Sequence, residues 1–349
     1  MEMLKKFSML IAILAFGFVL QNCTKDGPMG PAGKDGADGK DGNGTCATCH
    51  ADNADDVNLI FAQYALSQHG KGIVYEEEAG RINCGGCHSG DGFIESVKLG
   101  QDDPVTVATS KINCRTCHTI HTEFDETDWA LRVDKPVKLR HTGAEVDFKE
   151  GNTCARCHQA RTFKEVQGAD TVFITSGSST YSRFGPHYGT PANVVSMKGL
   201  YHLDGPMTIP ANNVHGNLSK GCVSCHMGKM ASNPATGGHT FKMTAAQMTE
   251  IEECKTCHPT GDFAKGTKAA EIKTMLAEVR SILLEKKWLD DSQSHDYFAQ
   301  SQDGNYMTKE QVQATLNYLF ISNDHSYGAH NPTYVYAVMK NTLDFLQKQ

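Results

Sequence analysis

The stretch Cys114–His121, which reads CRTCHTIH, decides the fold of this chain. Two cysteines three positions apart, followed at once by a histidine, form the C-x-x-C-H signature of covalent haem attachment. The two thiols add across the vinyl groups on one porphyrin edge, and His118 is then placed to bind the iron as proximal ligand. His121 lies on roughly the same side of a helical turn, so it cannot reach the far face of its own haem. It is instead positioned to cap the iron of a neighbouring haem.

The same signature occurs six times in 349 residues, and we number the attachment sites 1 to 6 in chain order. They are Cys46/Cys49–His50, Cys84/Cys87–His88, Cys114/Cys117–His118, Cys154/Cys157–His158, Cys222/Cys225–His226 and Cys254/Cys257–His258. Histidine makes up 16 of the 349 residues, so six such matches have odds of about 10⁻⁸ by chance. Paired C-x-x-C zinc ribbons, the alternative for these cysteines, do not need the histidines. The sequence therefore predicts six covalently attached haem c groups.

Ten of the 16 histidines remain for the second axial positions, which predicts bis-histidine coordination of every iron. The predicted distal ligands are His69, His121, His187, His215, His239 and His330. Two assignments stay open. His202 is an alternative to His215 as a distal ligand, and His325 is an alternative to His330. Met227 and Met230 are potential thioether ligands, but their closeness to His226 favours a packing role.

Composition predicts a fold in which haem replaces much of the protein core. Six haems leave roughly 50 residues for each, which is a low ratio of chain to cofactor. We expect a mostly α-helical fold with extensive irregular chain wrapped around a packed haem array, and with long C-terminal helices. Twelve of the 13 cysteines belong to the attachment sites, so only Cys23 is left over and no internal disulfide can form.

The N-terminus resembles a lipoprotein signal peptide over residues 1–22. Lys5 and Lys6 form the charged region, and Met9–Leu20 forms an apolar region that is too short to span a bilayer. Leu20 lies three residues before Cys23, whose acylation would hold the protein on a membrane surface. The alternative is a spare cysteine after an ordinary signal peptide.

Residues 23–44 form a spacer between the signal peptide and the haem domain. Gly27–Asn43 repeats Gly-X-Y, with glycine at every third position. Six triplets, the last of them incomplete, are short for a stable triple helix, so an extended polar spacer is favoured over a trimerising stalk.

Residues 45–349 form the predicted hexahaem domain, which begins and ends with helices. Apolar spacing predicts a helix over Asp52–His69, with Gly70 as its C-cap. Residues 260–349 form a helical cap, and the alternative role for this segment is a docking surface. Its predicted helices are Lys268–Lys287, one capped by Thr308 and Gln311 that runs through Phe320, and Thr333–Gln347 after the Asn331-Pro332 start signal.

The pattern resembles the multihaem cytochromes c of bacterial respiration, in particular the group that shares haem packing with pentahaem nitrite reductase and octahaem hydroxylamine oxidoreductase. CRTCHTIH, CVSCHM followed by GGHTF, ALSQHG and GAHNPTY carry this likeness over roughly Cys46–Leu346. The resemblance implies haems stacked in contact. Those nitrite reductases attach the catalytic haem through C-x-x-C-K, whereas all six sites here end in histidine.

Electron transfer through closely packed haems, in anaerobic or extracellular respiration, is the function that these features favour. The formal net charge of −7 argues against nucleic acid and favours basic or neutral redox proteins, such as other cytochromes, as partners. We expect an exported lipoprotein on the outer membrane or cell surface, acting as a carrier rather than as an enzyme.

Two other functions stay open. A reductase of a nitrogen or sulfur oxyanion needs one open haem, for which the interval His158–Cys222 could supply Tyr181, Arg183 or Tyr188. A trimer on the collagen-like segment, or a filament in which a spare histidine ligates a neighbour's iron, is the structural alternative.

Overall fold

The structure is a computed structural model of the chain, and it describes residues 55–105, 109–163, 171–174, 184–228, 230, 237–260, 268–292, 295–299 and 305–349. All of these residues belong to one compact unit, Gly42–Gln349. The signal peptide, Cys23, the Gly-X-Y segment and site 1 (Cys46, Cys49 and His50) lie outside the described residues.

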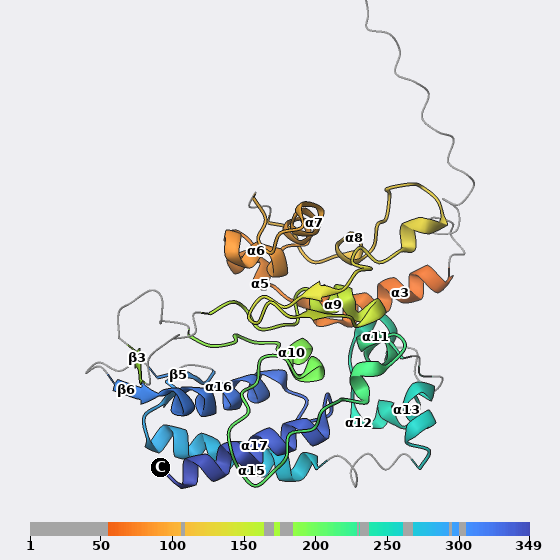
Figure 1. The fold of residues 1–349 in the computed structure, drawn as a ribbon. Helices are drawn as coiled ribbons and strands as arrows, with labels where there is room; N and C mark the ends of the chain where they lie inside the picture. Colours follow the sequence, from red (N-terminus) through yellow and green to blue (C-terminus); the bar gives the residue numbers. More distant parts are fainter. Residues whose placement is uncertain are drawn as a thin grey trace, which may run out of the picture. The chain divides into compact units, whose positions relative to one another are not determined.

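The described chain is mostly helical with long irregular connections, which confirms the predicted fold class (Figure 1). Its α-helices are α3 (Asp55–Leu66), α4 (Gln68–Lys71), α5 (Val74–Glu78), α6 (Ile82–His88), α7 (Gly90–Leu99), α8 (Cys114–Cys117), α9 (Asn152–Ala155), α10 (Pro191–Ser196), α11 (Cys222–His226), α12 (Ala245–Met248), α13 (Glu252–Cys257), α15 (Ala269–Glu285), α16 (Lys309–Asp324) and α17 (Pro332–Gln347). Short 3₁₀ turns are η2 (Glu126–Trp129), η3 (Lys149–Gly151), η4 (His215–Asn217) and η5 (Gly238–Thr240).

Strand structure in the described residues is confined to three antiparallel two-stranded ribbons. They pair β1 (Val137–Lys138) with β2 (Glu145–Val146), β3 (Thr171–Ile174) with β6 (Asn305–Thr308), and β4 (Leu289–Asp290) with β5 (Tyr297–Phe298). None of these ribbons is large enough to organise a sheet core, so the helices and the haem sites must do so.

The long C-terminal helices begin where their capping residues predict. The Thr308 hydroxyl accepts a hydrogen bond from the Gln311 N–H at 3.3 Å, and the Gln311 side chain accepts one from the Thr308 N–H at 2.9 Å. This is the predicted capping box, and the helix continues beyond the predicted Phe320 to Asp324. Pro332 opens α17, and the side chain of Asn331 accepts from the Tyr334 N–H at 3.4 Å.

These helices form most of a hydrophobic core to which Phe184, Val194 and Leu200 also contribute. The side chains of Ile272 and Val279 on α15, Phe320 on α16, and Tyr334 and Met339 on α17 are fully buried in it. The helices α15, α16 and α17 lie side by side in Figure 1. Truncating a buried aromatic such as Phe320 to alanine typically costs about 3–5 kcal/mol. The cap is therefore stabilised by ordinary protein packing.

The chain before the cap is built differently, from helices of one to three turns around a much smaller core. That core contains Phe93, Leu139, Phe148 and Ala155. Such short helices are not stable by propensity alone, so they depend on what packs against them. All five described attachment sites lie before the cap, and this smaller core lies among sites 2 to 4.

One predicted helix boundary is wrong. Gly70 does not end the first helix, because α3 ends at Leu66 and Gly70 lies inside α4. The Ser67 hydroxyl accepts a hydrogen bond from the Gly70 N–H at 2.9 Å and so starts a new helix. Glycine is needed at position 70 because a Cβ there would lie 2.2 Å from the carbonyl oxygen of Tyr64.

Candidate haem sites

Each described attachment site occupies a single helical turn. In sites 3, 4 and 6 the histidine N–H donates a hydrogen bond to the carbonyl of the first cysteine, at 2.9, 2.9 and 2.8 Å for His118, His158 and His258. One such turn directs both thiols and the imidazole of a site towards one porphyrin edge and its iron. None of the ten cysteines of these five sites forms a disulfide within the described residues.

Each histidine of the described attachment sites lies opposite a histidine from elsewhere in the chain. The distances between ring centroids are 5.9–6.4 Å. The pairs are His88 with His187, His118 with His239, His158 with His69, His226 with His330, and His258 with His215.

These separations fit an iron between the two rings. Two metal–nitrogen bonds of about 2 Å, together with the depth of the two imidazoles, put the ring centroids roughly 6 Å apart. Edge-to-face contacts between two rings reach similar centroid distances, so it is the recurrence of this separation at all five described attachment histidines that indicates an iron. The donor set also suits haem iron, because burial and the nearby His69, His226 and His330 lower the pKa of His158 to about 4 and so keep it neutral.

The two rival histidines lie elsewhere. His202 packs against the C-terminal core, where its Nε2 lies 3.1 Å from the hydroxyl of Tyr334. His325 is exposed and forms the left-handed C-cap of α16, with φ of 56°. The structure therefore brings His215 and His330, rather than these two, to an attachment histidine.

Three further histidines contact aromatic side chains. The ring of His121 stacks on Phe124 at 5.7 Å, with an interplanar angle of 9°. His141 stacks on Phe163 at 4.0 Å, and His295 lies 4.4 Å from Tyr188. His50, the attachment histidine to which His121 would be opposed, is outside the described residues.

The stretch CRTCHTIH is held by the η2 turn that follows it. The Asp128 carboxylate accepts hydrogen bonds from the backbone N–H groups of residues 121–124, at 2.7–3.2 Å. These donors, foremost that of Glu123, lower the pKa of the Asp128 carboxyl. The carbonyl of Trp129 lies 2.7 Å from Nδ1 of His118, so the imidazole is oriented with Nε2 towards His239.

Two comparisons with known proteins found matches to cytochromes. The sequence profile of the cytochrome c552 family matches residues 207–349, which contain sites 5 and 6 and the C-terminal helices. The outer cell wall cytochrome OcwA has a similar crystal structure, with a TM-score of 0.50 and 20% sequence identity. The chain has the fold of a multihaem c-type cytochrome. The similarity covers 82% of this chain and 50% of OcwA, so the chain spans about half the length of that protein.

No protein of curated function matches the chain. Within the described residues of this chain, no helix is both long enough and apolar enough to cross a membrane.

The attachment sites of the chain touch one another through their sulfur atoms. The side chains of Cys87 and Cys157, from sites 2 and 4, lie next to each other. The packing is reciprocal, since Cys87 Sγ lies 3.9 Å from the carbonyl of Arg156 and Cys157 Sγ lies 3.9 Å from that of Gly86. In the same way Cys154 meets Cys222, and Cys225 meets Cys254.

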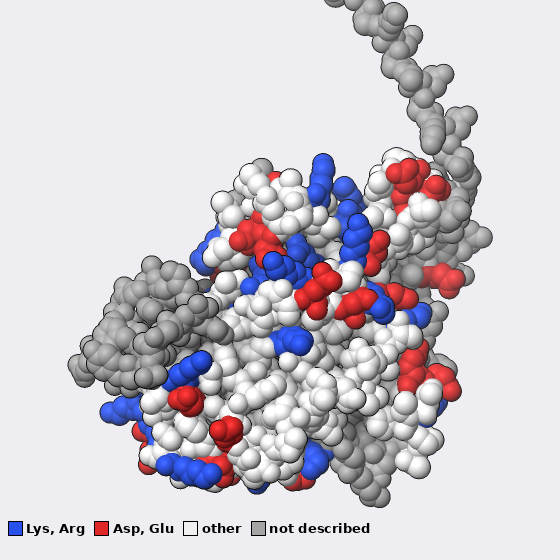
Figure 2. Space-filling view, in the orientation of Figure 1, with Lys and Arg blue, Asp and Glu red and all other residues white. Residues whose placement is uncertain are grey.

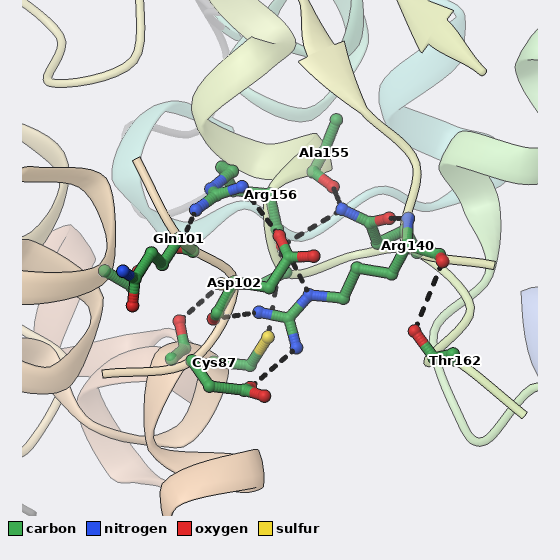
Figure 3. A network of polar contacts seen from close by, with 12 residues as sticks. Cys87, Gln101, Asp102, Arg140, Ala155, Arg156 and Thr162 are labelled. Atoms are coloured by element: carbon green, nitrogen blue, oxygen red, sulfur yellow. Dashed lines mark hydrogen bonds and ion pairs between the residues drawn. The ribbon is translucent and has the colours of Figure 1, made fainter. Parts of the chain in front are cut away.

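Two buried arginines stabilise the junction between sites 2 and 4 (Figure 3). Arg140 Nη2 donates to the Asp102 carbonyl at 2.5 Å, and Arg156 Nη1 donates to the Asp102 carboxylate at 3.0 Å. The two side chains are only 10% and 14% exposed, so both cations need nearby carboxylates, which Asp102 supplies to both and Asp103 to Arg140. Gly86 makes room for the junction, because a Cβ there would lie 2.4 Å from the Asp102 carbonyl oxygen.

Sequence reasoning did not identify these arginines, because no motif marks them. Their signal is spatial, since Arg156 sits between the two cysteines of site 4 and Arg140 arrives from the β1–β2 ribbon. On the face seen in Figure 2, Lys and Arg gather over the region of α6, α8 and α9, with Asp and Glu among them.

Proposed function

We propose that this chain is a hexahaem electron carrier in which every iron has two histidine ligands. The observation that carries the proposal is the set of five histidine pairs at 5.9–6.4 Å, each with one attachment histidine. In this proposal the distal ligands are His187 for site 2, His239 for site 3, His69 for site 4, His330 for site 5 and His215 for site 6. His121 then serves site 1, opposite His50.

Covalent haem supplies reversible one-electron chemistry at each site. The paired cysteines would hold the ring at each site, and the two opposed histidines would bind its iron. Ligation by two histidines, without methionine, favours low reduction potentials.

The sulfur contacts support an order for the array. Site 4 meets site 2 through Cys87 and Cys157, and it meets site 5 through Cys154 and Cys222. Site 5 meets site 6 through Cys225 and Cys254. We therefore place sites 4, 5 and 6 in one row, with site 2 joined to site 4.

Phe241 supports a further junction, between sites 3 and 4. Its ring lies 5.2 Å from His69 and 5.8 Å from His239, the proposed distal ligands of these two sites. Site 1 would follow site 3, because His121 belongs to the site 3 motif. The proposed array therefore runs 1–3–4–5–6, with site 2 as a branch at site 4.

The exported, surface-anchored part of the proposal rests on sequence. Residues 1–22 would be removed as a signal peptide, Cys23 would carry acyl chains, and Gly27–Asn43 would hold the haem domain away from the membrane. The similarity to an outer cell wall cytochrome supports a location at the cell surface, with other cytochromes or redox proteins as partners. The collagen-like segment leaves a trimer open.

Electron paramagnetic resonance of the oxidised protein tests the ligation. We expect six low-spin ferric haems in the wild type and, in His239→Ala, a high-spin signal of about one haem in six. His202→Ala is the matched control, since it removes a histidine that faces Tyr334 and should leave all haems low-spin. A high-spin haem in the wild type would overturn the electron-carrier proposal and favour the oxyanion reductase. Two of the residues suggested for the reductase pocket, Tyr181 and Arg183, lie outside the described residues.

A further inference from the structure

His330, the proposed distal ligand of site 5, has a carboxylate behind it. Its Nδ1 donates a hydrogen bond to Oδ1 of Asp324 at 2.6 Å, while the opposite side of the ring faces His226. The Asp324 side chain is only 1% exposed, so solvent does not screen this contact. A buried carboxylate therefore acts directly on one of the two imidazoles of site 5.

Other paired histidines direct Nδ1 to neutral acceptors. His118 faces the carbonyl of Trp129 at 2.7 Å, His215 that of Ala329 at 2.7 Å, and His226 that of Phe241 at 3.0 Å. Within site 5 itself, then, His226 has a carbonyl behind it and His330 has a carboxylate. The difference lies in charge, because the distances are similar.

The segment between Asp324 and His330 holds the carboxylate in place. Asp324 is the last residue of α16, and His325 turns the chain in a left-handed conformation. The Ser326 hydroxyl donates to Oδ2 of Asp324 and accepts from the N–H groups of Gly328 and His330, at 3.2 and 3.4 Å. Because both carboxylate oxygens are engaged, Asp324 has little freedom to turn away from the imidazole.

We propose that Asp324 is a positioning residue that lowers the reduction potential of the site 5 haem by giving His330 imidazolate character. The inference rests on the proposed ligation of site 5 by His226 and His330. A carboxylate acceptor draws the Nδ1 proton and raises the donor strength of Nε2, which stabilises the ferric over the ferrous state. The buried negative charge acts in the same direction.

The proposal gives site 5 a distinct role in the array. Site 5 joins site 4 to site 6 through Cys154–Cys222 and Cys225–Cys254. In the proposed array, an electron that passes from site 2 or site 3 to site 6 must cross the site 5 haem. Asp324 thereby makes site 5 harder to reduce than the same haem would be without the carboxylate.

Redox titration of the intact hexahaem protein tests the proposal, followed by visible absorbance and by electron paramagnetic resonance. Asp324→Asn keeps the shape and an acceptor oxygen but removes the charge. We expect about one sixth of the absorbance change to move to higher potential, and one low-spin ferric signal to change its g values. Asp344→Asn, which removes a carboxylate paired with Lys348, should leave both readouts unchanged.

Ser326→Ala provides a second variant with the opposite expectation. It removes the hydroxyl that donates to Asp324, so the carboxylate should accept more strongly from His330 and the same fraction should move to lower potential. Haem content of each variant is measured first, and Ser326→Ala keeps the test decisive if Asp324→Asn does not mature.

The outcomes separate this inference from the ligation on which it rests. Unchanged potentials and g values in Asp324→Asn, with all haems low-spin, would overturn the role of Asp324 and leave the ligation intact. If His330→Ala produces no high-spin haem, the ligation of site 5 itself is wrong.

Discussion

The side-chain oxygen of Gln63 on α3 accepts a hydrogen bond from the backbone N–H of His239, at 3.1 Å. This contact joins residues 176 positions apart and fixes the η5 turn that carries the proposed distal ligand of site 3. Gly238, next to His239, has φ of +49°, and a Cβ there would lie 2.3 Å from the same Gln63 oxygen. To avoid this close contact, the Gln63 side chain would have to give up its hydrogen bond to the His239 N–H.

Gly238→Ala should therefore loosen His239. We expect a high-spin fraction approaching one haem in six and a loss of about 2–3 kcal/mol of unfolding free energy. Gly100→Ala is the control, because Gly100 is also left-handed, with φ of +66°, but has no atom within 4 Å of the added Cβ. Equal high-spin fractions in the two variants would show that backbone strain alone, and not the Gln63 contact, explains the effect.

Asp128→Ala should destabilise the loop that follows site 3. The carboxylate accepts from four consecutive backbone N–H groups, which would lose their acceptor together. We expect a loss of about 2–3 kcal/mol in denaturant unfolding, and faster amide exchange confined to residues 121–124. Asp125→Ala removes the cap of η2 and serves as a milder comparison. Unchanged exchange at residues 121–124 would contradict this role.

Local signals predicted the helix starts well. Thr308 with Gln311, and Asn331 with Pro332, act within one turn, so the sequence alone carries the information. The first helix was harder, because Gly70 satisfies a close approach to Tyr64 rather than a left-handed cap. A glycine has several uses, and the pattern does not distinguish them.

The attachment sites could be read from sequence because C-x-x-C-H is contiguous. The partner of each histidine could not, since His69 meets His158, and His187 meets His88, across long intervals. Such pairings depend on the path of the irregular chain, which has no periodicity to read. The role of Asp324 could not be predicted for the same reason. In the sequence it is only the last residue of a helix, and its contact with His330 depends on the fold.

A haem-free chain should keep the helical cap and lose the rest. The helices α15, α16 and α17 share a packed apolar core, whereas sites 2 to 4 lie on one-turn to two-turn helices around a small core. We expect hydrogen exchange of cytoplasmically expressed, haem-free protein to show protection in residues 269–347 and little in residues 82–158. Protection of the two regions to the same degree would contradict this division.

Cys23→Ser should release the protein from membranes without changing its haem spectrum. Twelve of the 13 cysteines belong to attachment sites, and the remaining one follows a lipoprotein-like leader. Acyl chains on Cys23 would supply the membrane affinity, while the haem ligands lie elsewhere in the chain. Fractionation of cells followed by haem staining measures the distribution. A wild-type protein found in the soluble fraction would refute the lipidation.

Unfolding at acid pH should involve Asp296. Although burial raises the pKa of this carboxyl, hydrogen bonds from Arg280, at 2.8 Å, and from Tyr318 lower it below its ordinary value. A lowered folded-state pKa means that the carboxylate contributes stability above the unfolded-state value and loses it as the pH falls through the folded one. The unfolding free energy should therefore decrease as the pH drops below about 4.

Asp296→Asn should flatten this pH dependence, and Tyr318→Phe, which removes one donor, should give an intermediate slope. Denaturant unfolding followed by far-ultraviolet circular dichroism, from about pH 6 to pH 3, measures all three proteins. Because Arg280 keeps a second partner in Asp291, at 3.1 Å, the asparagine variant should still fold at neutral pH. A slope in Asp296→Asn as steep as that of the wild type would assign the acid sensitivity to other carboxyl groups.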